Sequence, residues 1–323
     1  MAGAPKLDPQ ARALLERLAR SAGPALDSLS AAEARRLYRE TRLELAPARV
    51  PVEEARDFLF LGAGGDVKAR YYRPLGEKPG AALPAVVYFH GGGWTCGDLD
   101  THDSVCRGIA VHGRCAVVAV DYRMGPEHKF PAAVEDAMAA VTWVGANASS
   151  LRIDVSRLAV AGESAGGNLA AVAAIALRES GPRLAMQVLV YPVVDQASDT
   201  DSLRRFAHGY SLTIELLRWY QRQYLRDEGD RADWRASPLR ARDHSRLPPA
   251  YIVTAGFDPL LDEGHAYADR LTQAGVPVVY ECFEGQIHGF LPMGGAIAAA
   301  RHAHARIGQM LRTRFGTFPG VRP

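Results

Sequence analysis

The sequence lacks the features that mark several classes of protein. No stretch approaches the roughly 20 consecutive apolar residues that cross a bilayer, so we expect no membrane span. Residues 1–20 alternate charged and apolar side chains and contain no uninterrupted apolar segment of a secretory signal, which favours a cytoplasmic location. With 38 Lys and Arg against 36 Asp and Glu, and no basic run interleaved with aromatic residues, we expect no nucleic-acid partner.

Cysteine is also scarce. The four cysteines form no Cys-x-x-Cys pair and no spacing typical of zinc sites: Cys96, Cys106, Cys115 and Cys282. In a chain for which no export signal is expected, they need not be paired. We therefore expect buried free thiols.

Apolar runs that alternate with helical patterns make up most of the 323 residues. Near-continuous runs of Val, Ala, Ile and Leu separated by helices are typical of a mostly parallel sheet covered on both faces. Together with two earlier strands joined by a glycine turn, the pattern predicts eight strands: 52–62, 67–75, 85–90, 115–123, 157–162, 185–192, 250–258 and 276–284. The predicted helices include 131–144, 165–179, 262–275 and 297–315. Functional groups of such sheets collect at the carboxyl ends of the strands.

Two segments depart from this alternation. Residues 9–46 have the periodicity of helices, with Ser30 as an N-cap and Glu33 at the capping-box position. Residues 196–246 form an insertion rich in arginine and aromatic residues. We expect the insertion to lie over the strand ends as a helical cap, joined there by the N-terminal helices. The predicted organisation is a cap part at 1–50, a second cap part at 196–246, and a core formed by 51–195 and 247–323.

Ser164 lies in a G-x-S-x-G pattern between a predicted strand and a predicted helix. Alone, such a pentapeptide arises by chance in roughly one chain in ten of this length. At a strand-to-helix junction it predicts a nucleophile elbow, a strained turn that lifts the hydroxyl off the backbone. The helix behind it also points amide groups toward developing negative charge. Ser164 is therefore the candidate nucleophile.

A serine nucleophile needs a base within hydrogen-bond reach, and His288 is the preferred candidate among ten histidines. His288 lies in a loop directly after the last predicted strand, near the carboxyl end of that strand. The other histidines considered fall in helices, in connecting segments or on a charged helical surface: His102, His112, His128, His265, His302 and His304.

The base in turn needs an acid that holds its tautomer and stabilises the imidazolium. Asp258 ends a predicted strand and reaches the same rim of the sheet. Asp262 and Glu263 follow at the start of a helix, where carboxylates are structurally ordinary. The chain order Ser164, Asp258, His288 is that of an α/β-hydrolase.

An oxyanion hole is predicted in HGGGW, residues 90–94, which follows a predicted strand. Its glycines can turn amide groups toward one point without obstruction by side chains. The candidate donors are the amides of Gly92, Gly93 and Ala165. The alternatives are a flexible turn or a phosphate-binding loop. No Lys-Ser/Thr pair follows, and neither glycine cluster fits G-x-G-x-x-G with an acid further on, which disfavours phosphate binding.

Several blocks, in order, resemble the bacterial hormone-sensitive-lipase family of esterases, also called family IV. They are HGGGW with GDLDTHD just after it, DYRMGPEHKFPAAVEDA, GESAGGN, DPLLDEG and IHGF, and they span about residues 50–315. The N-terminal LDPQARALLERL also resembles the cap helices of that family. Two small departures are Glu163, where the family often has Asp, and Met124-Gly125, where it often has Leu-Ala.

The resemblance implies an α/β-hydrolase that cleaves short- to medium-chain carboxylic esters and needs no metal or cofactor. It implies that His90 anchors the oxyanion loop and that Asp121 and Tyr122 brace the neighbouring strand end. It also implies a pocket lined partly by aromatic residues, for which the candidates are Trp94, Tyr210, Trp219 and Tyr220. Many members of the family pair as dimers through an edge strand, so we expect a homodimer.

Other functions fit less well. Hormone receptors of this scaffold lose the catalytic histidine, so the presence of His288 argues against a binding protein. Peptidase, amidase, lactonase and acyltransferase chemistry stay open, because the three residues alone do not distinguish them. A metal hydrolase built from Asp258, Asp262, Glu263 and His265 matches no metal-loop spacing.

Overall fold

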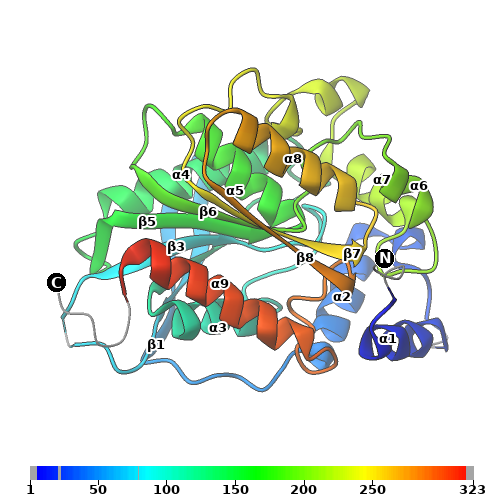
Figure 1. Ribbon diagram of the computed structural model, residues 1–323, viewed down its shortest axis with the longest axis horizontal. Coiled ribbons are helices and arrows are strands. Elements are labelled where there is room, and N and C mark those ends of the chain that lie inside the picture. Colours follow the sequence, from blue (N-terminus) through cyan, green and yellow to red (C-terminus); the bar gives the residue numbers. More distant parts are fainter. Residues whose placement is uncertain (1–5, 21–22, 79, 318–323) are drawn as a thin grey trace, which may run out of the picture.

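The computed structural model describes residues 6–20, 23–78 and 80–317, folded around one eight-stranded sheet (Figure 1). The strand order is β1-β2-β4-β3-β5-β6-β7-β8. β2 pairs antiparallel with β1 and β4, and every other neighbouring pair is parallel. The predicted mostly parallel sheet is confirmed, with these bounds: β1 Glu54–Gly62, β2 Gly65–Arg73, β3 Leu83–Phe89, β4 Ala116–Asp121, β5 Ile153–Glu163, β6 Leu184–Val190, β7 Ala250–Phe257 and β8 Val278–Ile287.

Helices cover both faces of the sheet, which explains why its central strands are largely apolar. α3 (Asp103–Gly113) and α9 (Ala299–Phe315) lie on one face, whereas α4 (Ala132–Ala146), α5 (Ala165–Ala176) and α8 (Leu261–Gln273) lie on the other (Figure 1). Successive side chains of a strand point to opposite faces. In β3, Val86 and Tyr88 pack toward α3 and α9, and Val87 and Phe89 pack toward α4 and α5. All four are buried, so both faces of the strand are apolar.

The remaining helices gather at the end of the sheet where the parallel strands end (Figure 1). They are α1 (Pro9–Arg20), α2 (Ala31–Leu45), α6 (Asp201–Arg205) and α7 (Ile214–Tyr224), with short 3₁₀ helices at Leu26–Ser28, Glu228–Ala232 and Pro238–Arg240. α2 begins with the predicted capping box between Ser30 and Glu33. A separate apolar cluster joins Tyr38 of α2 to Trp219 and Tyr220 of α7. In the ranges the structure describes, no helix is long and apolar enough to cross a membrane.

Candidate active site

The carboxyl ends of four strands bring the predicted site residues together. The oxyanion loop, residues 90–97, follows β3, and Ser164 follows β5. Asp258 follows β7, and His288 follows β8. Because these strands run parallel within one sheet, residues distant in sequence meet at one rim.

Ser164 lies in a strained turn between β5 and α5. Its φ of 56° and ψ of −118° lie outside the backbone conformations that serine ordinarily adopts. The neighbouring glycines are required by close backbone crossings: a Cβ on Gly166 would lie 1.9 Å from the carbonyl oxygen of Phe89, and one on Gly162 would lie 2.2 Å from that of Gly166. The local sequence therefore permits a turn that residues with side chains would obstruct.

A series of hydrogen bonds connects Asp258, His288 and Ser164. Nδ1 of His288 lies 2.7 Å from Oδ2 of Asp258, and Nε2 lies 2.9 Å from the hydroxyl oxygen of Ser164. The other carboxylate oxygen of Asp258 accepts from the amide of Leu260 at 2.9 Å. With Nδ1–H donating to Oδ2 of Asp258, Nε2 is the acceptor for the hydroxyl of Ser164. Asp258 is fully buried, and His288 and Ser164 are each 8% exposed.

The oxyanion loop lines the same pocket as Ser164. Gly92 and Gly93 line this pocket, and both have positive φ. A Cβ on Gly92 would lie 2.2 Å from the carbonyl oxygen of Cys96, so only glycine fits there. Within the part of the chain that the structure describes, neither glycine amide donates to another group. Ala165 is the first residue of α5, where amides have no partner within the helix.

Glu163 anchors the oxyanion loop from inside the core. Its Oε1 accepts from the amide of Gly91 at 2.5 Å and from Nε2 of His102 at 2.8 Å. Burial alone would raise the pKa of Glu163, but the hydrogen bond and charge of His102 lower it to about 2, so the carboxyl is ionised at neutral pH. Tyr122 donates to the carbonyl oxygen of His90 at 2.7 Å, in keeping with the bracing role that the resemblance implies.

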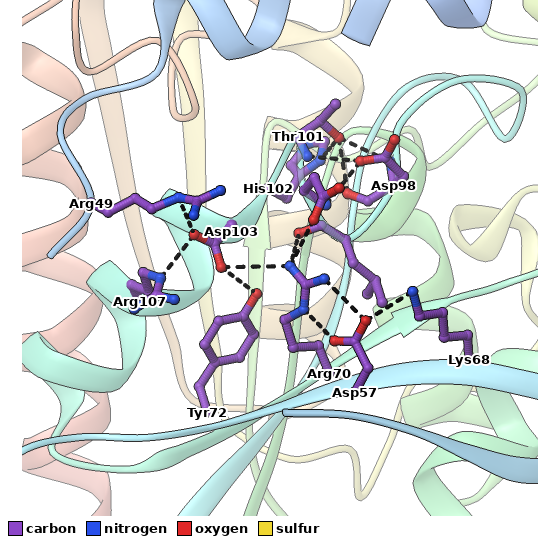
Figure 2. A network of polar contacts seen from close by, with 12 residues as sticks. Arg49, Asp57, Lys68, Arg70, Tyr72, Asp98, Thr101, His102, Asp103 and Arg107 are labelled. Atoms are coloured by element: carbon purple, nitrogen blue, oxygen red, sulfur yellow. Dashed lines mark hydrogen bonds and ion pairs between the residues drawn. The ribbon is translucent and has the colours of Figure 1, made fainter. Parts of the chain in front are cut away.

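His102 is the inner end of a polar network that extends toward β1 and β2 (Figure 2). Its Nδ1 lies 2.9 Å from the hydroxyl of Thr101, whose amide donates to Asp98 at 2.8 Å. The amide of Asp100 donates to the same carboxylate oxygen of Asp98 at 2.9 Å, and Asp100 forms an ion pair with Arg70 at 2.9 Å. The segment that follows the oxyanion loop is thus fixed to the sheet.

The loop that carries His288 is held by segments from outside the sheet. Ser211, in the loop before α7, donates to the carbonyl oxygen of His288 at 2.6 Å. Arg42 of α2 donates to that of Gly289 at 3.3 Å. The ring of Tyr191, just after β6, packs against the imidazole with 4.8 Å between the ring centroids. Both the backbone and the ring of the predicted base are therefore positioned.

A pocket of about 80 Å³ opens beside Ser164 and His288. Arg42 and Glu163 contribute charged groups to its wall. The apolar side chains on the wall come from the strand ends and from the inserted segment: Val193, Leu203, Leu212, Leu216, Leu217 and Leu260.

Two of the four aromatic residues proposed for the pocket wall lie on it. Trp94 and Tyr220 line the pocket. Tyr210 does not, because its ring packs against Phe257 with 5.6 Å between centroids. Trp219 is also absent from the wall and packs against Tyr220 at 5.3 Å. The expectation rested on the aromatic content of the segment, which does not tell which side of a helix faces inward.

Glu263 is a buried carboxyl on the same pocket wall. Its Oε1 accepts from the amides of Val194 and Asp195, at 2.8 and 3.3 Å. Burial raises the pKa of Glu263 to about 8, so it is mostly protonated at neutral pH. It therefore holds the turn after β6 as a mostly neutral group.

The four side chains considered for a metal hydrolase contact separate partners: Asp258 contacts His288, Asp262 the amide of Ser202, Glu263 that of Val194, and His265 the carboxylate of Asp269. Among the described residues, no group of three or more His, Cys, Asp or Glu side chains is arranged to hold a metal ion. All four cysteines are free thiols, three of them buried.

Sequence reasoning missed the residues that hold the two loops. In the sequence, Glu163 was noted only as a departure from a family pattern, and His102 was considered only as a possible base. Their positions could have indicated a role in holding the loop, because Glu163 adjoins the candidate nucleophile and His102 lies in the GDLDTHD block. Ser211 and Arg42 lie in no motif, and their contacts depend on how the inserted and N-terminal segments pack.

The sequence and fold match known proteins. A family model described as the α/β hydrolase fold matches residues 86–292, well over half of the chain. The carboxylic ester hydrolase LipN of Mycobacterium tuberculosis is 45% identical over 76% of this chain and 67% of its own length. The ethyl acetate hydrolase of Pseudomonas putida is 40% identical over 87% of this chain and 90% of its own length.

The solved structures agree. A crystal structure of LAE6, an α/β hydrolase enzyme from the metagenome of Lake Arreo in Spain, superposes with a TM-score of 0.93 and is 40% identical. The match covers 96% of this chain and 99% of that one. The resemblance seen in the sequence is thereby confirmed: the chain belongs to the carboxylesterases of the α/β-hydrolase superfamily.

Proposed function

We propose that this protein is a serine esterase that hydrolyses short- to medium-chain carboxylic esters through an acyl-enzyme. The observation that carries the proposal is the hydrogen-bonded series from Asp258 through His288 to Ser164, which ends beside two glycine amides in a pocket. The relative from Pseudomonas putida, an ethyl acetate hydrolase, supports a small ester as substrate.

In the first half of the reaction, the hydroxyl oxygen of Ser164 attacks the ester carbonyl. His288 takes the serine proton at Nε2, and Asp258 stabilises the imidazolium through Nδ1–H. The amides of Gly92, Gly93 and Ala165 donate to the oxyanion as it forms. His288 then returns the proton to the alcohol oxygen as the ester bond breaks.

In the second half, water replaces the alcohol. His288 takes a proton from that water, whose oxygen attacks the carbonyl carbon of the acyl-serine. The same three amides stabilise the second tetrahedral intermediate. Collapse of this intermediate returns the proton to Ser164 and releases the carboxylic acid.

The pocket wall supports an acyl chain of modest length. Its inner surface combines leucine side chains with the rings of Trp94 and Tyr220. Burial of each methylene of the acyl chain against such a surface stabilises the bound substrate by about 0.8 kcal/mol, until the chain outgrows the pocket. We expect a rise in kcat/KM from acetate toward middle chain lengths and a fall by about octanoate.

The helices over the strand ends are proposed as a two-part cap, with residues 1–50 and 196–246 over a core of 51–195 and 247–323. This division is supported by the cluster that joins Tyr38 of α2 to Trp219 and Tyr220 of α7. A homodimer is proposed through β8, which among the described residues pairs with a strand on one side only, with β7. A cytoplasmic location is proposed on the basis of the four free thiols.

The test is a panel of p-nitrophenyl esters from acetate to octanoate, assayed on wild type and Ser164→Ala. We expect the variant to lose at least about a thousandfold in kcat, because the three residues act as a unit. Ser104→Ala, at a buried serine in α3, is the matched control and is expected to keep wild-type turnover. Full activity in Ser164→Ala would contradict the proposal.

The same proteins also separate the rival chemistries. p-Nitroanilides test amide cleavage, lactones test ring opening, and an added alcohol tests acyl transfer through the yield of new ester. We expect esters to have the highest kcat/KM, since an alkoxide leaves more readily than an amide nitrogen. Activity retained in EDTA would argue against metal hydrolysis.

A further inference from the structure

Helix α2 presents a cationic face to the loops around the active site. Arg35, Arg39 and Arg42 follow one another at spacings of four and three residues, which puts them on one side of the helix. Surface helices ordinarily turn such residues toward solvent. Here each of these arginines donates a hydrogen bond to a segment beside the active site.

Arg35 holds the turn that contains the predicted oxyanion donors. Its Nε donates to the carbonyl oxygen of Thr95 at 2.8 Å, and its Nη2 donates to that of Gly125 at 2.7 Å. The amide of Thr95 donates to the carbonyl oxygen of Gly92 at 3.2 Å, and its hydroxyl donates to that of Gly93 at 3.0 Å. A shift of Thr95 would therefore move both glycines.

Arg42 and the end of α2 hold the loop of the predicted base. Arg42 stacks on Tyr38, with its guanidinium carbon 4.9 Å from the ring centroid, and donates to the carbonyl oxygen of Gly289. Gly289 directly follows His288. The carbonyl oxygen of Leu45 accepts from the amide of Gly295 at 2.9 Å, so α2 fixes this loop at two points.

Arg39 connects the same helix to the anchor network of the oxyanion loop. It forms ion pairs with Asp98 and Asp100, which belong to the network that leads to His102 (Figure 2). One helix thus contacts the oxyanion loop, the anchor network of that loop and the histidine loop.

We propose that α2 is a catalytic brace in which Arg35 and Arg42 are positioning residues. They fix the position of the oxyanion loop relative to that of the histidine loop. A helix is stiff and rises about 1.5 Å per residue, so these two arginines attach to points about 10 Å apart. The loops they hold therefore do not shift independently. The inference rests on the proposed function, because it requires Ser164 and His288 to act on one substrate.

Arg35→Met is the sharpest test, because Arg35 is not on the pocket wall. We expect kcat to fall about tenfold to a hundredfold, the effect of a misplacement near 1 Å, with KM within about twofold of wild type. Arg35→Lys, which restores one donor, is expected to recover part of the loss. If α2 serves only to stabilise the fold, Arg35→Met lowers the melting temperature and leaves kcat per folded molecule unchanged, which would overturn the brace.

Two control variants distinguish loss of the brace from loss of a surface charge. Arg36→Met removes the next arginine of α2, which is exposed. Glu127→Gln removes the carboxylate that pairs with Arg35 but keeps both carbonyl contacts of Arg35. Both variants are expected to keep kcat within about twofold, and losses equal to that of Arg35→Met would overturn the brace.

A second readout distinguishes failure of the brace from failure of the proposed function. Diethyl p-nitrophenyl phosphate reports assembly of the site: the hydroxyl oxygen of Ser164 bonds to phosphorus, p-nitrophenolate leaves, and His288 takes the serine proton. We expect Arg35→Met to react at least about tenfold more slowly than wild type. No reaction at Ser164 of wild type would refute the proposed function, whereas equal rates in both proteins would refute the brace alone.

The double variant Arg35→Met/Arg42→Met tests whether the two arginines act through one helix. If both arginines act through α2, the second substitution causes little further loss of activity, because the first has already released one loop from its position relative to the other. We expect the double variant to lose less activity than the product of the two single losses. Losses that multiply would mean two independent clamps and would overturn the brace.

Discussion

The two loops on opposite sides of the active site both contact α2, but their other anchors come from different directions. Apart from its contact with Arg35, the oxyanion loop is held from inside the core, where the ionised carboxylate of Glu163 accepts from the amide of Gly91 and Tyr122 donates to a carbonyl oxygen. The histidine loop is held mainly from outside the sheet, where Ser211 and Arg42 donate to its first two carbonyl oxygens. The core contact of Glu163 and the outer contact of Ser211 differ in strength as well as origin.

The difference in strength follows from charge and burial. A buried hydrogen bond to an ionised group contributes about 1.5 to 3 kcal/mol, whereas a neutral hydroxyl bond to a carbonyl contributes about 1 kcal/mol. Glu163 is 3% exposed, and Ser211 is half-buried at the pocket. Loss of the core anchor should therefore cost more activity than loss of a single outer contact.

The largest effect is expected for Glu163→Gln. Glutamine keeps an acceptor oxygen for the amide of Gly91 but removes the charge that His102 faces. We expect a loss of about thirtyfold to a hundredfold in kcat on p-nitrophenyl butyrate, since donors aimed at the oxyanion act through their exact placement. Steady-state kinetics measure this loss in kcat, on variant protein whose folding has been checked.

The matched control is Glu284→Gln, because Glu284 is an exposed glutamate of β8. It is expected to keep wild-type kcat and KM. Wild-type turnover in Glu163→Gln would mean that the core does not fix the oxyanion loop, and the contrast between the two loops would disappear.

The same contrast explains what sequence could and could not predict. The strands, and the four site positions at their carboxyl ends, could be predicted from the periodicity of apolar residues, the turn residues and the chain order. These signals can be read directly from the sequence. Ser211 and Arg42 reach the histidine loop only because the inserted and N-terminal helices pack over the strand ends, and packing between distant segments has no local signal. For the same reason Trp94, which lies beside the glycines in the sequence, is on the pocket wall, whereas Tyr210 of the inserted segment is not.

A smaller effect is expected for Ser211→Ala, which removes the contact between the inserted segment and the carbonyl oxygen of His288. A neutral hydrogen bond of about 1 kcal/mol corresponds to roughly a fivefold loss in kcat. Ser211→Thr keeps the hydroxyl and is expected to stay within about twofold of wild type. A loss in Ser211→Ala as large as that in Glu163→Gln would reverse the ranking of the two anchors.

The smallest effect on turnover is expected for Glu263→Gln, which tests a third loop, the turn after β6. Its core anchor is a buried carboxyl that accepts from the amides of Val194 and Asp195. Glutamine keeps the acceptor oxygen, so kcat near neutral pH should change by less than about twofold. Stability, by contrast, should acquire a different dependence on pH.

The sign of that dependence follows from the pKa of Glu263, which burial raises from 4.5 to about 8. Below about pH 4.5 the carboxyl is protonated in both states, so wild type and Glu263→Gln have the same pH dependence. Between about pH 5 and 8 the unfolded chain releases the proton while the folded protein keeps it, so wild type loses stability as pH rises. Urea unfolding at pH 5, 6.5 and 8 should show the free energy of unfolding of the variant rising relative to that of wild type, by on the order of 3 kcal/mol across this range. A difference that stays constant across this range, with Glu284→Gln as reference, would mean that Glu263 ionises in the folded protein and holds its loop as Glu163 does.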